Sequence, residues 1–195
     1  MKPSAVEIVK SRLRVASEAL RDLNTADTYD QFFDAWFVFL TAWKSIYTTL
    51  EQGAKPSPQS MQWFGGKARE RKNDALLQYL FQARNDEEHG LKRSVEHGGG
   101  TQLYDVTPGQ KISMLADPIY GKMRAVDVQT GQPLNLINEQ PAGPTLAVVE
   151  DRNHKKYYPP IGFLGEILVD SSPIGVAEAA LKYMELLVDE AEGLQ

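Results

Sequence analysis

Three residues near the middle of the chain, Arg84, Asn85 and His89, have side chains suited to cleaving a phosphodiester without a metal ion. RNA is cut in this way when its own 2′-hydroxyl attacks the adjacent phosphorus, which requires a proton carrier and a fixed cation. Histidine titrates near neutral pH and suits proton transfer, whereas arginine stays charged and offers a planar fork to phosphate oxygens. The pattern therefore makes Arg84 and His89 candidate catalytic residues, with Asn85 orienting the histidine.

The spacing of these residues limits how they can act together. On a helix, Asn85 and His89 lie four residues apart and share one face. Arg84 and His89 lie five residues apart, about 140° around an ideal helix, so their Cα atoms do not share a face. A single copy of the motif therefore makes a sparse site.

The segment from Leu80 to Gly90 resembles the signature of the HEPN superfamily (higher eukaryotes and prokaryotes nucleotide-binding), and the wider phrase from Leu77 resembles a bacterial protein group within or near it. That signature is an arginine, then usually Asn, Asp or His, and a histidine a few residues later on a late helix of a small bundle. Arg84, Asn85 and His89 match it. The resemblance covers about residues 4–91 and the terminal helix, and the β-rich middle of the chain is not part of the basic HEPN fold.

In HEPN nucleases two motifs meet across a dimer interface, which doubles the groups available for catalysis. The resemblance therefore implies a homodimer acting as a metal-independent endoribonuclease, with no cofactor. It equally implies an alternative, a non-catalytic dimerisation or nucleotide- or RNA-binding module in which the same residues bind a ligand or the partner protomer. A third alternative is a structural protein whose motif only stabilises the helix bundle.

The motif residues also have an ordinary interpretation. Arg84 and Glu88 have the i,i+4 spacing of an ion pair on a helix. Asp86 and Glu87 can be ordinary solvated charges, and His89 can contact the C-terminal carbonyls of the helix. The three acids beside the motif would also repel RNA, which argues against strong nuclease activity.

Two further groups of residues are candidates for contacting nucleic acid. A basic cluster upstream of the motif could guide phosphate or form a solvated helix face: Lys67, Arg69, Arg71 and Lys72. The tract 152–156, followed by Tyr157 and Tyr158, combines charge with aromatic rings that can stack on bases. His97 and His154 are expected in exposed loops.

Apolar spacing of three and four residues predicts the elements that position these side chains. Helices are expected over about 4–23, 28–52 and 58–91, the last broken or bent at Gly65-Gly66, and again after Ser172-Pro173. The aromatic stripe of the second helix is typical of a bundle core. Short β-favourable runs occupy the middle, with turns at Thr130-Gly131 and at residues 151–153.

These patterns predict an α+β protein, a HEPN-like antiparallel helix bundle with a small antiparallel β-sheet inserted before the C-terminal helix. The expected parts are the bundle at 1–97, the β-rich insertion at 98–170, and a helix at 171–195 that packs back on the bundle.

Composition excludes several classes of protein. The chain has 195 residues and no cysteine, so disulfides, thiol catalysis and cysteine-based zinc sites are ruled out. Its formal net charge of −5 argues against broad, sequence-independent clamping of nucleic acid. The first ten residues have no apolar core of a signal peptide, and no apolar run reaches the length of a membrane span, which favours the cytoplasm. No phosphate-binding loop or dinucleotide-binding fingerprint is present.

Overall fold

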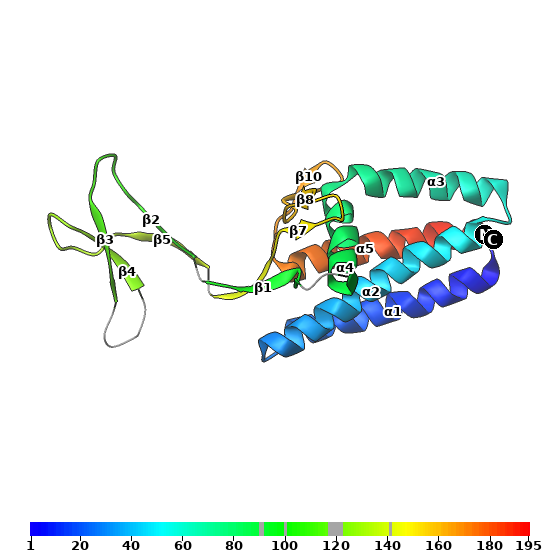
Figure 1. Cartoon of the computed structure of the whole chain (residues 1–195), viewed down its shortest axis with the longest axis horizontal. Helices are drawn as coiled ribbons and strands as arrows, with labels where there is room; N and C mark the ends of the chain where they lie inside the picture. The colour runs from blue at the N-terminus through cyan, green and yellow to red at the C-terminus, as the bar shows by residue number, and fades with distance from the viewer. Residues whose placement is uncertain (90–91, 100, 117–122, 141) are drawn as a thin grey trace. The chain divides into compact units, whose positions relative to one another are not determined.

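The computed structural model describes the chain except at residues 90–91, 100, 117–122 and 141. Two compact units divide it: a helical unit made of Met1–Glu96 and Pro144–Gln195, and a smaller β unit, His97–Gly143. Figure 1 shows all the labelled helices in the helical unit. The α+β class predicted from the sequence is confirmed.

The helical unit is a bundle whose long helices lie side by side. Its described helices are α1 (Pro3–Thr25), α2 (Tyr29–Ala54), α3 (Pro58–Asn73), α4 (Ala75–His89) and α5 (Pro173–Glu192). Helix α1 packs along α2, and α5 packs back against α1, α2 and α4, as the sequence predicts. The two ends of the chain meet, because the Met1 ammonium donates a hydrogen bond to the carbonyl of Leu194 (Figure 1).

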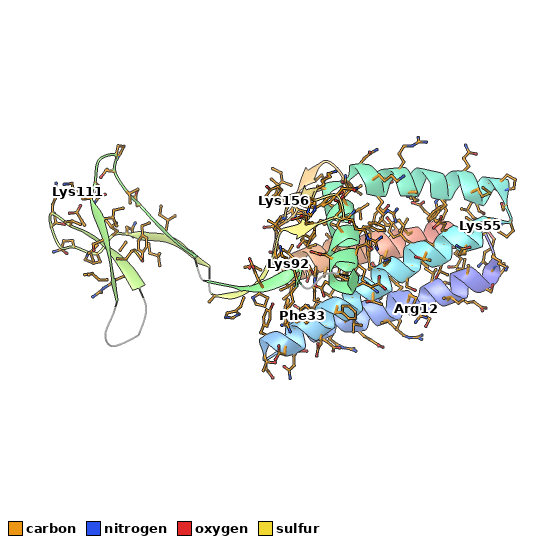
Figure 2. The ribbon with its side chains drawn as sticks, viewed as in Figure 1. Arg12, Phe33, Lys55, Lys92, Lys111 and Lys156 are labelled. Atoms are coloured by element: carbon orange, nitrogen blue, oxygen red, sulfur yellow. The ribbon has the colours of Figure 1, made fainter. Side chains whose placement is uncertain are left out.

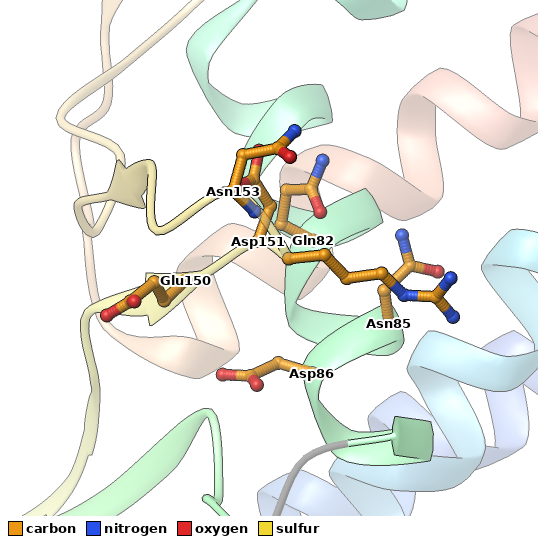
Figure 3. Close-up of a pocket in the computed structure, with 7 residues that line it drawn as sticks. Gln82, Asn85, Asp86, Glu150, Asp151 and Asn153 are labelled. Carbon is orange, nitrogen blue, oxygen red and sulfur yellow. The ribbon is translucent and has the colours of Figure 1, made fainter.

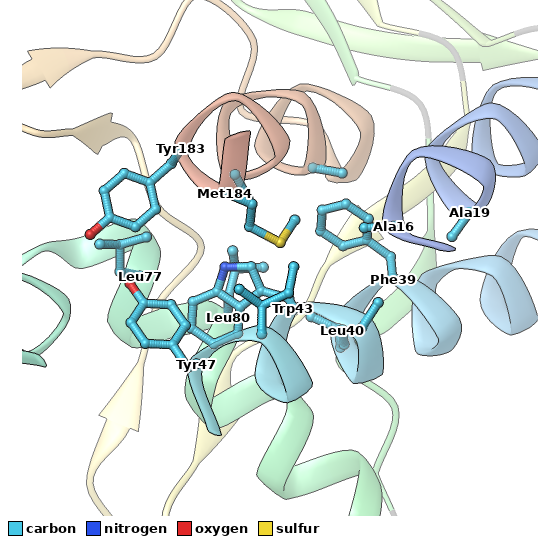
Figure 4. Close-up of a cluster of buried hydrophobic side chains, with 14 of the residues drawn as sticks. Ala16, Ala19, Phe39, Leu40, Trp43, Tyr47, Leu77, Leu80, Tyr183 and Met184 are labelled. Atoms are coloured by element: carbon cyan, nitrogen blue, oxygen red, sulfur yellow. The ribbon is translucent and has the colours of Figure 1, made fainter. Parts of the chain in front are cut away.

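Helix α2 supplies the centre of the core. Trp36, Phe39, Leu40 and Trp43 are fully buried, and Figure 4 shows the last three close to Met184 of α5. Burial of each such side chain stabilises the fold by about 1.5–3 kcal/mol relative to exposure. The aromatic stripe of α2 is therefore core, as its spacing predicts.

Side-chain caps fix where α2 and α5 begin. Thr28 precedes α2 and forms a reciprocal capping box with Gln31, each side chain accepting the other's backbone N–H at 3.2 Å. Ser172 caps α5 by accepting the N–H of Gly175 at 3.2 Å, with Pro173 at the first helical position. Both starts agree with the sequence.

Of the break or bend predicted at Gly65-Gly66, the break is wrong, because α3 continues through both glycines. Two glycines cost a helix about 1 kcal/mol each. Contacts on either side hold α3 in place: Trp63 Nε1 and Lys67 Nζ donate to the Glu190 carboxylate of α5 at 2.6 and 2.9 Å. The chain instead turns at Asp74 (φ −91°, ψ 134°), which separates α3 from α4.

The strands are short and form separate pairs rather than the one small sheet expected. Those described are β1 (Val95–Gly98), β2 (Thr101–Tyr104), β3 (Ile112–Ala116), β4 (Met123–Asp127), β5 (Leu136–Gln140), β6 (Gly143–Leu146), β7 (Val149–Glu150), β8 (Lys156–Tyr157), β9 (Gly162–Phe163) and β10 (Glu166–Ile167). Strands β2–β5, β3–β4, β7–β8 and β9–β10 pair antiparallel, and β1 pairs with β6. None of the described strands exceeds five residues, and Val126 of β4 forms one further bridge, with Pro133.

The two turns predicted between β runs are confirmed. The first follows β4, where the Asp127 carboxylate accepts the N–H groups of Gln129 and Thr130 at 2.8 Å and Gly131 takes a positive φ of 69°. The second, residues 151–153, joins β7 to β8. None of the described helices has the length and apolar character needed to cross a membrane.

Candidate functional site

Helix α4 carries the motif and packs between α2 and the β7–β8 hairpin. Its N-terminus is fixed by Asp74, whose Oδ1 accepts the N–H of Leu77 at 2.9 Å. Its inner face is tied by the Tyr79 hydroxyl, which donates to the carbonyls of Ser94 and Ala147 at 3.1 and 2.8 Å. These contacts position the start and the inner face of α4, the helix that carries Arg84 and Asn85.

Arg84 is buried and already paired. Only 9% of the residue is exposed, and its Nη1 lies 2.8 Å from Oε2 of Glu88. The two side chains are spaced i,i+4 on α4 and lie at ion-pair distance. The guanidinium carbon also lies 5.5 Å from the ring centre of Phe37 on α2. Nε of Arg84 has no hydrogen-bond partner in the part of the chain that the structure describes.

Asn85 is bound by a different helix. Its Oδ1 accepts a hydrogen bond of 2.9 Å from Nζ of Lys44 on α2, and the same ammonium lies 3.2 Å from Oε2 of Glu88. Arg84, Glu88, Lys44 and Asn85 thus form one connected polar network. The side chains of Arg84 and Lys44 lower the pKa of Glu88, so this carboxylate stays charged at neutral pH.

His89 is the last residue of α4, and its side chain lies outside the described part of the structure. The backbone of α4 places His89 about one helical turn after Asn85. The oxygen of Asn85 that could orient a histidine is engaged by Lys44. The pairing of Asn85 with His89 therefore stays a prediction.

Glu87 is not the solvated charge that the sequence suggests. Its Oε1 accepts the N–H of Ser94 at 3.0 Å and also the hydroxyl of Ser94. Trp36 Nε1 donates to the same hydroxyl at 2.9 Å, which ties the carboxylate to the core. Burial raises the pKa of Glu87, and this effect exceeds the lowering by the Ser94 donors and the nearby Arg93 charge.

A cavity of about 380 Å³ opens beside Asn85. One wall is α4, with Gln82, Asn85 and Asp86, and the other is the turn between β7 and β8, residues 150–153 (Figure 3). The cavity therefore joins the motif to part of the charged tract 152–156. Amide side chains from both walls, including Asn153, supply donors and acceptors for a polar ligand.

The three carboxylates that line this cavity differ in their hydrogen-bond and ion-pair partners. Glu150 pairs with the ring of His154. Asp151 shapes the turn, because its Oδ1 accepts the N–H groups of Asn153 and Lys155 at 2.8 and 3.1 Å. Desolvation opposes its charge, yet these donors lower its pKa overall. Asp86 lies on the α4 wall, where its charge would disfavour an anion close by.

Arg152 is the cation of the cavity. It is exposed, and its side chain forms no ion pair or hydrogen bond within the described ranges. Its guanidinium is therefore available to a ligand. The sequence signal for this wall was the Asp-Arg-Asn turn, but nothing local to it indicated that it would face α4.

The basic cluster on α3 does not reach this cavity. Lys67 pairs with Glu190 at 2.9 Å, and the guanidinium of Arg71 packs between the rings of Phe81 and Tyr47, at 4.2 and 5.1 Å. Arg69 and Lys72 are exposed. None of the four is among the residues that line the cavity beside Asn85.

Within the described ranges no group of three or more His, Asp or Glu side chains is placed to hold a metal ion. No family model, curated protein or solved structure matches the chain.

Proposed function

We propose that this chain is a HEPN-like protein that binds RNA or a nucleotide through the motif face of α4 without cutting it. The observation that carries the proposal is the network in which Glu88 pairs with Arg84 and Lys44 binds Asn85. A catalytic arginine must offer its charge to the transition state. Here that charge is buried and balanced, so the motif is arranged for structure and binding rather than for turnover.

The cavity beside Asn85 supports the binding part of this proposal. Gln82, Asn85 and Asn153 present amides, which pair well with the donor and acceptor edges of bases. Arg152 adds an available guanidinium that suits phosphate oxygens. The neighbouring Asp86 would disfavour a phosphate beside it, which favours binding of the phosphate by Arg152.

The proposal includes a second copy of the chain. Phe37 of α2 is 37% exposed although its ring lies 5.5 Å from the guanidinium of the buried Arg84, and Val38, the next residue of α2, is 42% exposed. An apolar patch beside the motif suits a two-fold interface, in which the same residues of both copies meet. This arrangement would bring the motif helices of two protomers close together.

A second candidate function, metal-independent endoribonuclease activity, is favoured by one observation. Nε of Arg84 is buried without a hydrogen-bond partner among the described residues, which leaves a charged donor for a phosphate oxygen. In that case Glu88 would release Arg84 when RNA binds. Arg84 would then stabilise the phosphorane and His89 would move the proton.

The test combines binding and cleavage on the same samples. Mixed cellular RNA is incubated in EDTA with wild type, Arg84→Ala and His89→Ala, while binding is followed with labelled RNA. We expect binding without cleavage, and a loss of affinity of about fivefold in Asn85→Ala and in Arg152→Ala, one hydrogen bond each. Arg12→Ala removes an exposed arginine on α1 and serves as the control.

Two outcomes would overturn the proposal in different ways. Cleavage by wild type alone, leaving cyclic-phosphate ends, would establish the nuclease instead. Absence of any RNA or nucleotide binding by wild type would contradict both the binding function and the ribonuclease function. The remaining interpretation would be that the motif only stabilises the helix bundle.

A further inference from the structure

A second groove lies along the N-terminal half of α4. It has a volume of about 360 Å³ and is lined by the end of α3, the first turns of α4 including Gln78, and residues 155–161. The segment that forms its outer wall continues directly from the turn that walls the cavity beside Asn85. Both sites therefore belong to one face of the helical unit.

The charge of this groove is opposite to that of the chain as a whole. No acid is among its described lining residues, and two lysines, Lys155 and Lys156, are. The cavity beside Asn85 has three acids, and the chain carries a formal net charge of −5. A local positive site on an acidic protein indicates selection of an anionic ligand at that place.

The two lysines are available to such a ligand. Lys155 Nζ lies 4.7 Å from the ring centre of Tyr157, and Lys156 is an exposed residue of β8, labelled in Figure 2. Neither ammonium forms an ion pair inside the described ranges. The charge of Lys155 acts on Asp151 in the adjacent turn and helps to lower the pKa of that carboxyl. Asp74, the residue before α4, is engaged by two backbone N–H groups, from Leu77 at 2.9 Å and Leu164 at 2.7 Å. It therefore does not neutralise the lysines by direct pairing.

Tyr158 gives the groove an exposed aromatic surface. The residue is 68% exposed, unlike the tyrosines of the core. It precedes Pro159-Pro160, and a residue before proline is restricted to extended backbone. Pro160 is buried, which anchors the segment. The ring is thus held out to solvent on a stiff support, so that stacking a planar group on it costs little conformational entropy.

Helix α4 connects this groove to the motif. Gln78, Gln82 and Asn85 follow one another at spacings of four and three residues and so lie on one helical face. The rise from Gln78 to Asn85 is about 10 Å. An elongated ligand that occupies the lysine groove would therefore pass the same amides that line the cavity beside Asn85.

We infer that this groove binds single-stranded nucleic acid, with a base stacked on Tyr158 and phosphates bound by Lys155 and Lys156. Base stacking requires an unpaired strand, because the bases of a duplex already stack on each other. The inference rests on the proposed function for its ligand class, but it assigns a separate site on different residues.

The test measures fluorescence anisotropy of a labelled oligouridine, the DNA oligomer of the same length, and a duplex. Tyr158→Ala is expected to weaken single-strand binding at least about fivefold, whereas Tyr158→Phe keeps the stacking ring and stays near wild type. Affinity falls as salt rises, so the slope of log affinity against log salt concentration is negative. The double variant Lys155→Gln/Lys156→Gln should make this slope shallower by about 1.4. Lys55→Ala, an exposed lysine at the far end of the helical unit (Figure 2), should leave the slope unchanged.

The outcomes separate this inference from the proposed function. If wild type binds RNA and Asn85→Ala weakens it, but Tyr158→Ala and the double lysine variant do not, the groove inference is overturned and the proposed function stands. Duplex binding as tight as single-strand binding would also overturn it. Loss of affinity in the groove variants with no effect of Asn85→Ala would support the groove and contradict the role given to the motif cavity. Weaker binding of DNA than RNA would add recognition of the ribose hydroxyl, and equal binding would confine recognition to base and phosphate.

Discussion

Nζ of Lys44 on α2 lies 2.9 Å from Oδ1 of Asn85 on α4, so the amide oxygen expected to orient His89 is bound by another helix. The same ammonium lies 3.2 Å from the carboxylate that neutralises Arg84. Lys44 thus joins the asparagine and the arginine of the motif through Glu88. Lys44, which lies about 40 residues before the motif in the sequence, therefore contacts Asn85 directly and Arg84 indirectly through Glu88.

Lys44→Met tests the weight of this contact. The change keeps the apolar stem and removes the ammonium, so Asn85 loses its hydrogen bond. We expect the free energy of unfolding to fall by about 1–2 kcal/mol, because the bond of the same ammonium to Glu88 is lost as well and each such bond contributes about 1 kcal/mol. Urea denaturation followed by circular dichroism measures it.

Lys10→Met is the matched control, because Lys10 pairs with Glu192 at 2.6 Å while both side chains are about half exposed. Such solvated pairs contribute little. Equal losses of stability in the two variants would mean that the Lys44 contact has no special role in holding α4.

Glu87→Gln is expected to stabilise the protein at neutral pH. Burial raises the folded-state pKa of Glu87 above its unfolded value, so both states hold the proton at low pH. As pH rises through the unfolded pKa, the unfolded state releases its proton first, and stability is lost until the folded pKa is passed. Glutamine cannot ionise and escapes this loss, while its oxygen can still accept from Ser94.

The measurement is urea unfolding of wild type and Glu87→Gln between pH 4 and pH 8. The variant should gain on wild type as pH increases, and the two should converge toward pH 4. Glu88→Gln should respond in the opposite sense, because the pKa of Glu88 is lowered by Arg84 and Lys44. A constant difference across the pH range for Glu87→Gln would show that its ionisation does not oppose folding.

Glycines at two places in the helices should respond oppositely to alanine. A Cβ on Gly53 would lie 2.4 Å from the Cβ of Ala5, where α1 and α2 approach, whereas a Cβ on Gly65 or Gly66 would meet nothing within 4 Å. Gly53→Ala should therefore cost about 1–3 kcal/mol of stability. Gly65→Ala should add about 0.5–1 kcal/mol, since alanine orders a helix more readily.

Thermal unfolding of the three single variants gives the comparison, with Gly66→Ala as the internal replicate of Gly65→Ala. Destabilisation by Gly65→Ala would contradict the open space around this glycine and would indicate that a side chain there is not tolerated. Stabilisation by Gly53→Ala would contradict the close approach of α1 and α2.

The elements that could be predicted from sequence are those whose signals are local. The aromatic stripe of α2, the capping residue Ser172 before α5 and the turn at 151–153 each depend on neighbours a few residues away. The break at Gly65-Gly66 was predicted wrongly because helix propensity ignores the contacts of Trp63 and Lys67 with α5. Tertiary contacts outweighed the cost of two glycines.

The site was less predictable because its second wall comes from a distant segment. The i,i+4 pairing of Arg84 with Glu88 follows from spacing alone and is confirmed. Binding of Asn85 by Lys44, burial of Glu87 against Ser94 and the approach of residues 150–153 to α4 depend on the packing of α2 and β7–β8. Arg71 also looked like a surface charge, yet its long stem lets it pack on Phe81.

Phe37→Glu tests whether the motif face meets a second copy of the chain. The ring of Phe37 is 37% exposed and lies 5.5 Å from the guanidinium of Arg84, whose charge Glu88 already balances, so a carboxylate at this position adds an uncompensated negative charge to the motif face. In a two-fold interface the new charge would appear twice and repel its copy. We expect wild type to be a dimer by light scattering after size exclusion, and Phe37→Glu to be a monomer with unchanged helical circular dichroism. Ile8→Glu places the same charge on α1, at a side chain that is 47% exposed, and should remain dimeric. A wild-type monomer, or dimers in both variants, would remove the motif face from the proposed interface.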